Sequence, residues 1–131
     1  MTTNEICRLL GLTRREIQWW EETGAVQCDW ADHFRWFTED QALAVAIVSE
    51  LRRKGVTLAR IRKMKLRKAL GEFLVVWKSA GRWCARDGLI QTVAHAPGPC
   101  VVVSVEDLRA KLWPAQKTFE SRQSAAATLT Q

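Results

Sequence analysis

The sequence predicts an α+β protein whose first half is mainly helical and whose second half is rich in strands. In the first half, apolar residues recur every three or four positions in segments that begin at Thr or Asn and end at Gly, a pattern typical of short amphipathic helices. After Gly71, short apolar runs alternate with Gly and Pro, which is typical of strands. We therefore expect a helical domain over residues 1–70, a small β-rich unit over 71–114 and a flexible tail over 115–131.

Two short helices are expected at the N-terminus. Within residues 4–10, Ile6, Leu9 and Leu10 share one helical face, and Gly11 ends the helix. Thr13 is a good N-cap for the next helix, which stops at Gly24. Two helices joined by a tight turn that contains glycine are the signature of a helix-turn-helix.

A short hairpin is predicted next. Its polar tip is residues 29–33, and the apolar residues that flank the tip are Val26, Cys28, Phe34, Trp36 and Phe37. Thr38 and Gln41 then form the pattern of a capping box, which opens a long helix that Gly55 closes. Thr57 caps a fourth helix. The first half thus holds four helices and one hairpin.

The second half is expected to contain three strands and a C-terminal helix. The strands are predicted at Phe73–Trp77, Leu89–Val93 and Cys100–Val103, and the helix begins after Ser104 and ends before Pro114. A unit of about 40 residues is too small to be stable alone or to enclose a sizeable ligand. An exposed edge such as Cys100–Val103 can pair with its copy, so we interpret this unit as an oligomerisation module.

Two adjacent tryptophans, in TRREIQWWEETG, raise a question of orientation, because neighbours on a helix point about 100° apart. On a helical wheel, Ile17 and Trp20 share the core side, whereas Arg15, Gln18 and Trp19 lie on the other. A flat ring beside Arg and Gln donors suits a surface that lies against DNA. Packing of Trp19 beneath the hairpin is the alternative.

The charge distribution also favours a nucleic acid or another anionic partner. The net charge is +6, and residues 51–70 contain nine Lys or Arg and no Asp or Glu. Lys54, at the end of the long helix, is the strongest candidate for a DNA contact in this run. Alternatively, the same charges lie on two helix faces that are simply exposed to solvent.

Other classes of function find little support. The cysteines Cys7, Cys28, Cys84 and Cys100 lack the spacing of a metal site, so we expect neither a metal nor a cofactor. No catalytic arrangement is apparent beyond the weak pair Cys84 and His95, so we do not expect an enzyme. With no signal peptide and no apolar run near the 20 or so residues that span a bilayer, a cytoplasmic protein with reduced thiols is predicted.

Three segments, in matching order and spacing, resemble the DNA-binding domain of the MerR family of transcription regulators. TNEICRLLGLTRREIQWWEETGAV is similar to the family's I-G-E-x-A-x-x-x-G-V-S-x-R-T-L-R-Y-Y-E-x-x-G-L-L. FRWFTEDQ is similar to Y-R-x-Y-S-x-x-D, and LRRKGVTLARIRKM to L-R-x-x-G-x-S-L-x-x-I. The resemblance covers residues 3–67. It implies a winged helix-turn-helix whose second helix enters the major groove and whose wings hold flanking phosphates.

The resemblance also implies a set of DNA-binding residues. They are Arg14, Arg15, Gln18, Trp19, Arg35, Phe37 and Lys54. Tryptophans replace the two tyrosines of the second helix, and phenylalanines at 34 and 37 replace the wing tyrosines, which removes hydroxyl donors. Asp29 and Asp32 near the wing tip repel phosphate. Binding is therefore expected to depend on the arginines and on the basic run.

The family's ligand sensors continue into a long dimerising helix, which this sequence lacks after Leu70. The resulting interpretation is a homodimeric regulator on a near-palindromic site in double-stranded DNA. One alternative is an excisionase-like architectural protein that forms cooperative filaments on DNA. Another is an antitoxin or interaction module in which residues 71–114, part of a chain with seven tryptophans, bind a protein partner.

Overall fold

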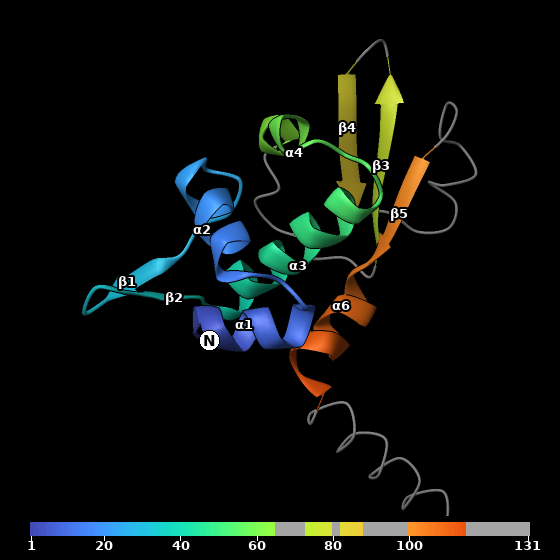
Figure 1. Ribbon diagram of the computed structural model, residues 1–131. Coiled ribbons are helices and arrows are strands. Elements are labelled where there is room, and N and C mark those ends of the chain that lie inside the picture. The colour runs from blue at the N-terminus through green and yellow to red at the C-terminus, as the bar shows by residue number, and fades with distance from the viewer. Residues whose placement is uncertain (65–72, 80–81, 88–99, 115–131) are drawn as a thin grey trace, which may run out of the picture.

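The computed structural model describes residues 1–64, 73–79, 82–87 and 100–114. The elements, in chain order, are helices α1–α4, strands β1 and β2 between α2 and α3, strands β3–β5, and helix α6 (Figure 1). The predicted mixture of helices with small antiparallel sheets is confirmed. The strand predicted at Leu89–Val93 and the tail predicted over 115–131 lie outside the described residues.

Helices α1 (Thr3–Leu10) and α2 (Arg14–Glu22) begin and end much as the local sequence predicts. Gly11 takes the left-handed conformation, with φ of 67°, that closes α1 and turns the chain. Thr13 and Glu16 form a reciprocal capping box at the start of α2: the Thr13 hydroxyl accepts from the Glu16 amide, and the Glu16 carboxylate accepts from the Thr13 amide. These caps fix where α2 points.

The hairpin consists of β1 (Asp29–Ala31) and β2 (Phe34–Trp36), which pair in antiparallel register. Its tip is only Asp32 and His33, which have φ values of 49° and 71°, as a two-residue turn requires. The predicted tip of residues 29–33 was therefore too long. Because Asp and His tolerate the left-handed region, the turn needs no glycine, and Asp29–Ala31 remain free to pair.

Helix α3 (Glu39–Arg53) is the centre of the molecule, and α4 (Leu58–Met64) follows it after a short turn at Gly55. The predicted capping box is confirmed, with the Thr38 amide donating to Gln41 Oε1 at 2.9 Å. Eight residues of α3 are buried: Ala42, Leu43, Val45, Ala46, Ile47, Val48, Ser49 and Leu51. A helix buried over so much of its surface is a core element.

The second half supplies a three-stranded antiparallel sheet and one helix. The strands are β3 (Phe73–Ser79), β4 (Arg82–Asp87) and β5 (Cys100–Ser104), in the order β4-β3-β5, and α6 is Val105–Leu112. The strands predicted at Phe73–Trp77 and Cys100–Val103 and the helix after Ser104 are confirmed. Strand β4 was not predicted, because its RWCARD sequence is mostly polar.

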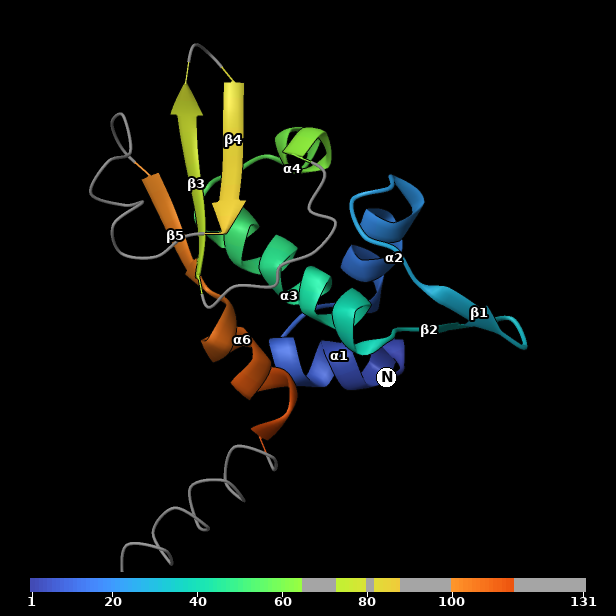
Figure 2. The same cartoon turned by 180° about the vertical axis from the view of Figure 1, so that it is seen from behind.

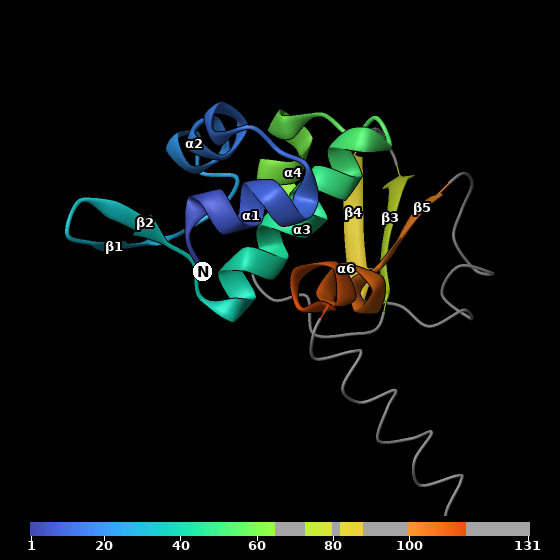
Figure 3. The same ribbon diagram turned by 60° about the horizontal axis from the view of Figure 1, so that its bottom comes forward.

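Residues on both sides of position 70 share one hydrophobic core. Val103, Leu108 and Leu112 belong to the same buried cluster as Ile6 and Ile47. Helix α6 packs against α1 and α3, and the sheet stands next to the C-terminal end of α3 (Figures 1, 2 and 3). The domain boundary at residue 70 stays a prediction. The two halves nevertheless share a core, because residues of the second half cover apolar residues of the first.

Over the described residues, no helix is long and apolar enough to span a membrane. Nor do the described His, Cys, Asp and Glu residues gather in any group of three that can hold a metal ion. The thiols of Cys7, Cys28 and Cys100 are free and partly buried. His95 lies outside the described residues.

Candidate nucleic-acid interface

Helix α2 divides its side chains between the core and the surface. Ile17 is fully buried and Trp20 is 5% exposed, whereas Trp19 is 58% exposed. Arg14, Arg15 and Gln18 are exposed as well. The predicted assignment of the two tryptophans is therefore confirmed: Trp20 is a core residue and Trp19 a surface residue. One side of α2 presents two guanidinium groups, an amide and an indole to solvent.

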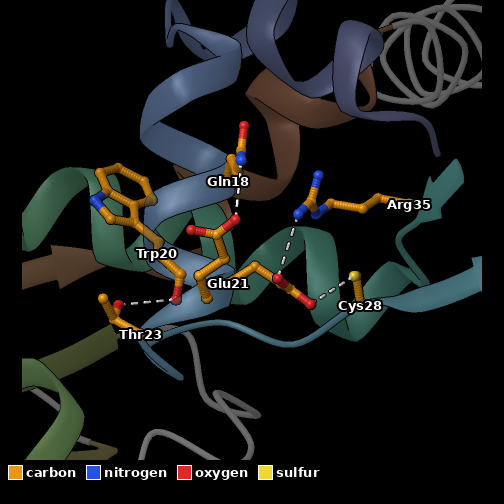
Figure 4. Close-up of polar contacts among 7 residues, drawn as sticks. Gln18, Trp20, Glu21, Thr23, Cys28 and Arg35 are labelled. Carbon is orange, nitrogen blue, oxygen red and sulfur yellow. Dashed lines mark hydrogen bonds and ion pairs between the residues drawn. The ribbon is translucent and has the colours of Figure 1, made fainter.

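The polar groups of this exposed face have few partners within the chain. The Gln18 Nε2 donates to Glu22 Oε1 at 2.9 Å, one turn along the same helix (Figure 4). At the end of the helix, the Thr23 hydroxyl donates to the Trp20 carbonyl at 3.3 Å. Both contacts are local, so they leave the face of α2 accessible to another molecule.

A groove of about 560 Å³ runs along one side of α2. The turn at Gly11, Leu12 and Thr13, the C-terminal part of α3 and the Trp19 side of α2 form its walls. Three arginines line it: Arg15, Arg52 and Arg53. Arg53 is anchored there, because its Nη2 donates to the Leu10 carbonyl at 3.1 Å. The result is a partly apolar groove whose charged lining consists of three arginines and one carboxylate, Glu16.

Arg52 and Arg53 were not predicted as interface residues. The signal available was their membership of the basic run over 51–70, in the last turn of α3. Their position across from Trp19 depends on how α2 packs on α3. The periodicity of either helix alone does not predict it.

On the opposite side of α2 from the groove, Glu21 joins the helix to the hairpin. An oxygen of Glu21 lies 3.5 Å from Arg35 Nη2, and its other oxygen accepts from Cys28 Sγ at 3.6 Å (Figure 4). The Arg35 guanidinium also stacks over the Trp30 ring, 4.6 Å from its centroid. Glu21 therefore sets the angle between α2 and the hairpin.

Arg35, predicted to contact DNA, is largely engaged in this junction. Its side chain is 20% exposed, and its Nε is buried with no hydrogen-bond partner. The structure thus assigns Arg35 a positioning contact, and direct binding to phosphate stays a prediction. The Glu21 partner was missed, although Glu21 follows the two tryptophans where the family pattern has Y-Y-E.

The junction also changes the acidity of a thiol. Partial burial, followed by the negative charge and hydrogen bond of Glu21, raises the pKa of Cys28 from 9.0 to about 11. Burial likewise raises the pKa of Cys7. Thiols with raised pKa values are poor nucleophiles, so these cysteines have the properties of packing residues.

Phe37 does not reach the surface. Its side chain is 1% exposed because side chains alternate along the extended chain, which turns Phe37 to the same side as Arg35 and into the core. Its backbone is fixed by a reciprocal pair of hydrogen bonds with Met1, at 2.8 and 2.9 Å. Burial of this side chain gives the predicted DNA contact no support, and the contact stays a prediction.

Lys54 points toward the second half of the chain. Its Nζ donates to the Val102 carbonyl at 2.9 Å and lies 3.9 Å from a Glu50 oxygen. This bond ties the end of α3 to β5, and the predicted DNA contact by Lys54 stays a prediction. Local patterns could not predict this bond, because Val102 lies far along the chain.

These elements define a helix-turn-helix protein with an exposed second helix, a hairpin beside it and a basic groove. The profile of the MerR HTH family regulatory proteins matches residues 1–68, and the chain belongs to that family. The match supports a DNA-binding transcription regulator, whose regulatory module is not typically an enzyme. No curated protein matches the chain.

Proposed function

We propose that the chain binds a near-palindromic DNA site as a homodimer in the cytoplasm, with α2 in the major groove and the β1–β2 hairpin as a wing. The observation that carries this proposal is the exposed face of α2, where Arg14, Arg15, Gln18 and Trp19 stand together over a buried Ile17 and Trp20. A helix fits the major groove, and Arg and Gln are suited to base edges and phosphates.

Each exposed residue has a distinct task in this arrangement. Arg15 borders the groove and binds backbone phosphate, and Arg14 adds a second phosphate contact at the start of the helix. Gln18 exchanges its bond to Glu22 for a base edge. Trp19 packs its ring on sugar and directs its N–H toward phosphate. Arg35 holds the wing in place through Glu21.

On the duplex, the second half supplies the contact between the two bound copies. In the described sheet, β5 and β4 are the edge strands, because β3 lies between them. An edge strand carries backbone groups that can pair with a second chain. A two-fold axis through such a pair gives two recognition helices for two half-sites, which a single short helix needs for useful specificity.

The experiment is a comparison of binding to the duplex upstream of the chain's own gene and to a scrambled duplex, across a salt series. We expect the native duplex to bind more tightly, and log K to fall with log salt by about 0.9 for each phosphate contacted. Arg15→Ala should lower that slope by about 1. Arg109→Ala, an equal loss of charge on the exposed surface of α6, is the matched control and should leave the slope unchanged.

The same assay distinguishes the proposal from its competitors. A single shifted species at a stoichiometry of two chains per site supports the dimer. A ladder of evenly spaced species points to a cooperative filament. Equal weak binding to both duplexes, with no effect of Arg15→Ala, contradicts recognition through α2.

A further inference from the structure

The hairpin carries most of the exposed aromatic surface within residues 1–63 and 100–114, the part of the chain whose side-chain burial the structure describes. Of the four large hydrophobic side chains exposed in that part, Trp30, Phe34 and Trp36 lie on the hairpin and Trp19 lies on α2. Phe34, directly after the turn, is 75% exposed. The hairpin projects away from the helices in two views (Figures 1 and 3). A clustered apolar surface of this kind marks a contact with another macromolecule.

The charges of the hairpin favour a basic protein surface over DNA. Asp29 and Asp32 are its acidic residues, and its single arginine, Arg35, is already paired with Glu21. Phosphates are repelled by such a surface, whereas guanidinium groups are attracted to it. The register places Phe34 and Trp36 on the face opposite Arg35, so this aromatic face is turned away from α2.

A surface with the complementary properties lies on the same chain. The groove beside α2 combines Leu12 and Trp19 with the arginines Arg15, Arg52 and Arg53. The hairpin is tied by Glu21 to the opposite side of α2 and extends away from it, so its tip is directed away from the groove of its own chain. A second copy can bring its hairpin there.

We propose that the hairpin tip of one copy docks in the α2–α3 groove of a second copy, with Phe34 against the apolar wall and Asp32 against Arg52. One such contact is small, since a stable interface buries about 800 Å² on each partner. A reciprocal exchange doubles the buried area and closes the pair around a two-fold axis. Hairpin and groove flank the exposed face of α2, so the two α2 helices face each other in this dimer.

This dimer covers Arg15 and Trp19, the residues proposed above for DNA. Self-association and duplex binding therefore exclude one another. In the absence of DNA, the exposed face of α2 is covered by the second copy. The mutual exclusion of dimer and duplex rests on the proposed function, whereas formation of the dimer does not. Its contacts are partly ionic, so rising salt weakens the dimer as well.

The first test is sedimentation equilibrium of the full chain without DNA. Phe34→Ser, Asp32→Arg and Arg52→Glu should each weaken self-association at least about tenfold, the usual loss for a central contact. The double variant Asp32→Arg/Arg52→Glu should restore it, because each reversed charge meets the other across the interface. Glu106→Arg, an equal charge change on the exposed part of α6, is the matched control and should have no effect.

Association of Phe34→Ser at wild-type strength, or no recovery in the double variant, overturns the proposal. The first result would locate the contact elsewhere, for instance at β5. Phe34 and Asp32 are exposed, so their replacement leaves the core intact. Circular dichroism of each variant verifies this.

The second test adds the upstream duplex to wild type and to Phe34→Ser. The variant should bind the duplex more tightly, because none of its chains are held in a dimer that cannot bind DNA. Weaker binding by the variant would place Phe34 on DNA and overturn the exclusion. If no variant binds DNA but Phe34→Ser still abolishes the dimer, the proposed function fails while the dimer stands.

Discussion

Helix α3 and the β1–β2 hairpin follow one another in the chain but have opposite environments. Eight residues of α3 are buried, whereas five of the six hairpin strand residues are exposed. Both segments are rich in large apolar side chains. In α3 these side chains form the core, and in the hairpin they face solvent. The comparison indicates that stability resides in α3 and that the hairpin's aromatic residues are available for recognition.

The largest expected effect is the loss of a core side chain. Ile47→Ala should lower the free energy of unfolding by about 2 to 5 kcal/mol, because it leaves a cavity in a fully buried site. Phe34→Ala removes a larger side chain from the hairpin and should change stability by less than about 0.5 kcal/mol. Urea unfolding of both variants measures the contrast. A costly Phe34→Ala would show that the hairpin is part of the folding unit.

A smaller effect is expected at the junction between the two regions. Glu21→Ala should cost about 1 to 2 kcal/mol, since it leaves the mostly buried Arg35 without its ionic partner. Glu22→Ala is the matched control, because its bond to Gln18 is exposed, and it should cost less than about 0.5 kcal/mol. Equal costs would mean that Glu21 does not fix the hairpin on α2. Thermal or urea unfolding distinguishes these outcomes.

The smallest effect is a dependence of stability on alkaline pH. In the folded chain the pKa of Cys28 is about 11, above the 9.0 of the exposed thiol. The unfolded chain therefore releases this proton first, and the free energy of unfolding should fall as the pH rises from 9 to 11. Cys28→Ala should show a shallower fall, measured by urea unfolding at several pH values. An unchanged slope would contradict the raised pKa.

The local sequence predicted most of the first half, because caps, turns and periodicity act over a few residues. Thr13, Thr38 and Gly11 marked the ends of helices correctly, and the wheel assigned Trp19 and Trp20. In the second half β3 and β5 were found from their β-branched runs. The RWCARD of β4 gave no such signal.

Contacts between segments that are distant along the chain could not be predicted from local sequence patterns. The partners of Arg35 and Lys54 depend on how the hairpin meets α2 and how β5 meets α3. The basic run suggested a DNA contact for Lys54, and the Val102 carbonyl that accepts from its Nζ lies too far along the chain to be predicted from local patterns. The burial of Phe37 was not predicted for a related reason: its resemblance to a wing residue said nothing of its pairing with Met1.

The packing of α6 on α1 has a consequence for synthesis of the chain. The ribosome releases Ile6 and Leu10 long before Leu108 and Leu112, their companions in the same core. Contacts so distant along the chain are slow to form, because a long loop must close first. The nascent first half therefore exposes an apolar strip until the segment with Leu108 and Leu112 has been synthesised. While it is exposed, this strip is a binding surface for chaperones that act on the nascent chain.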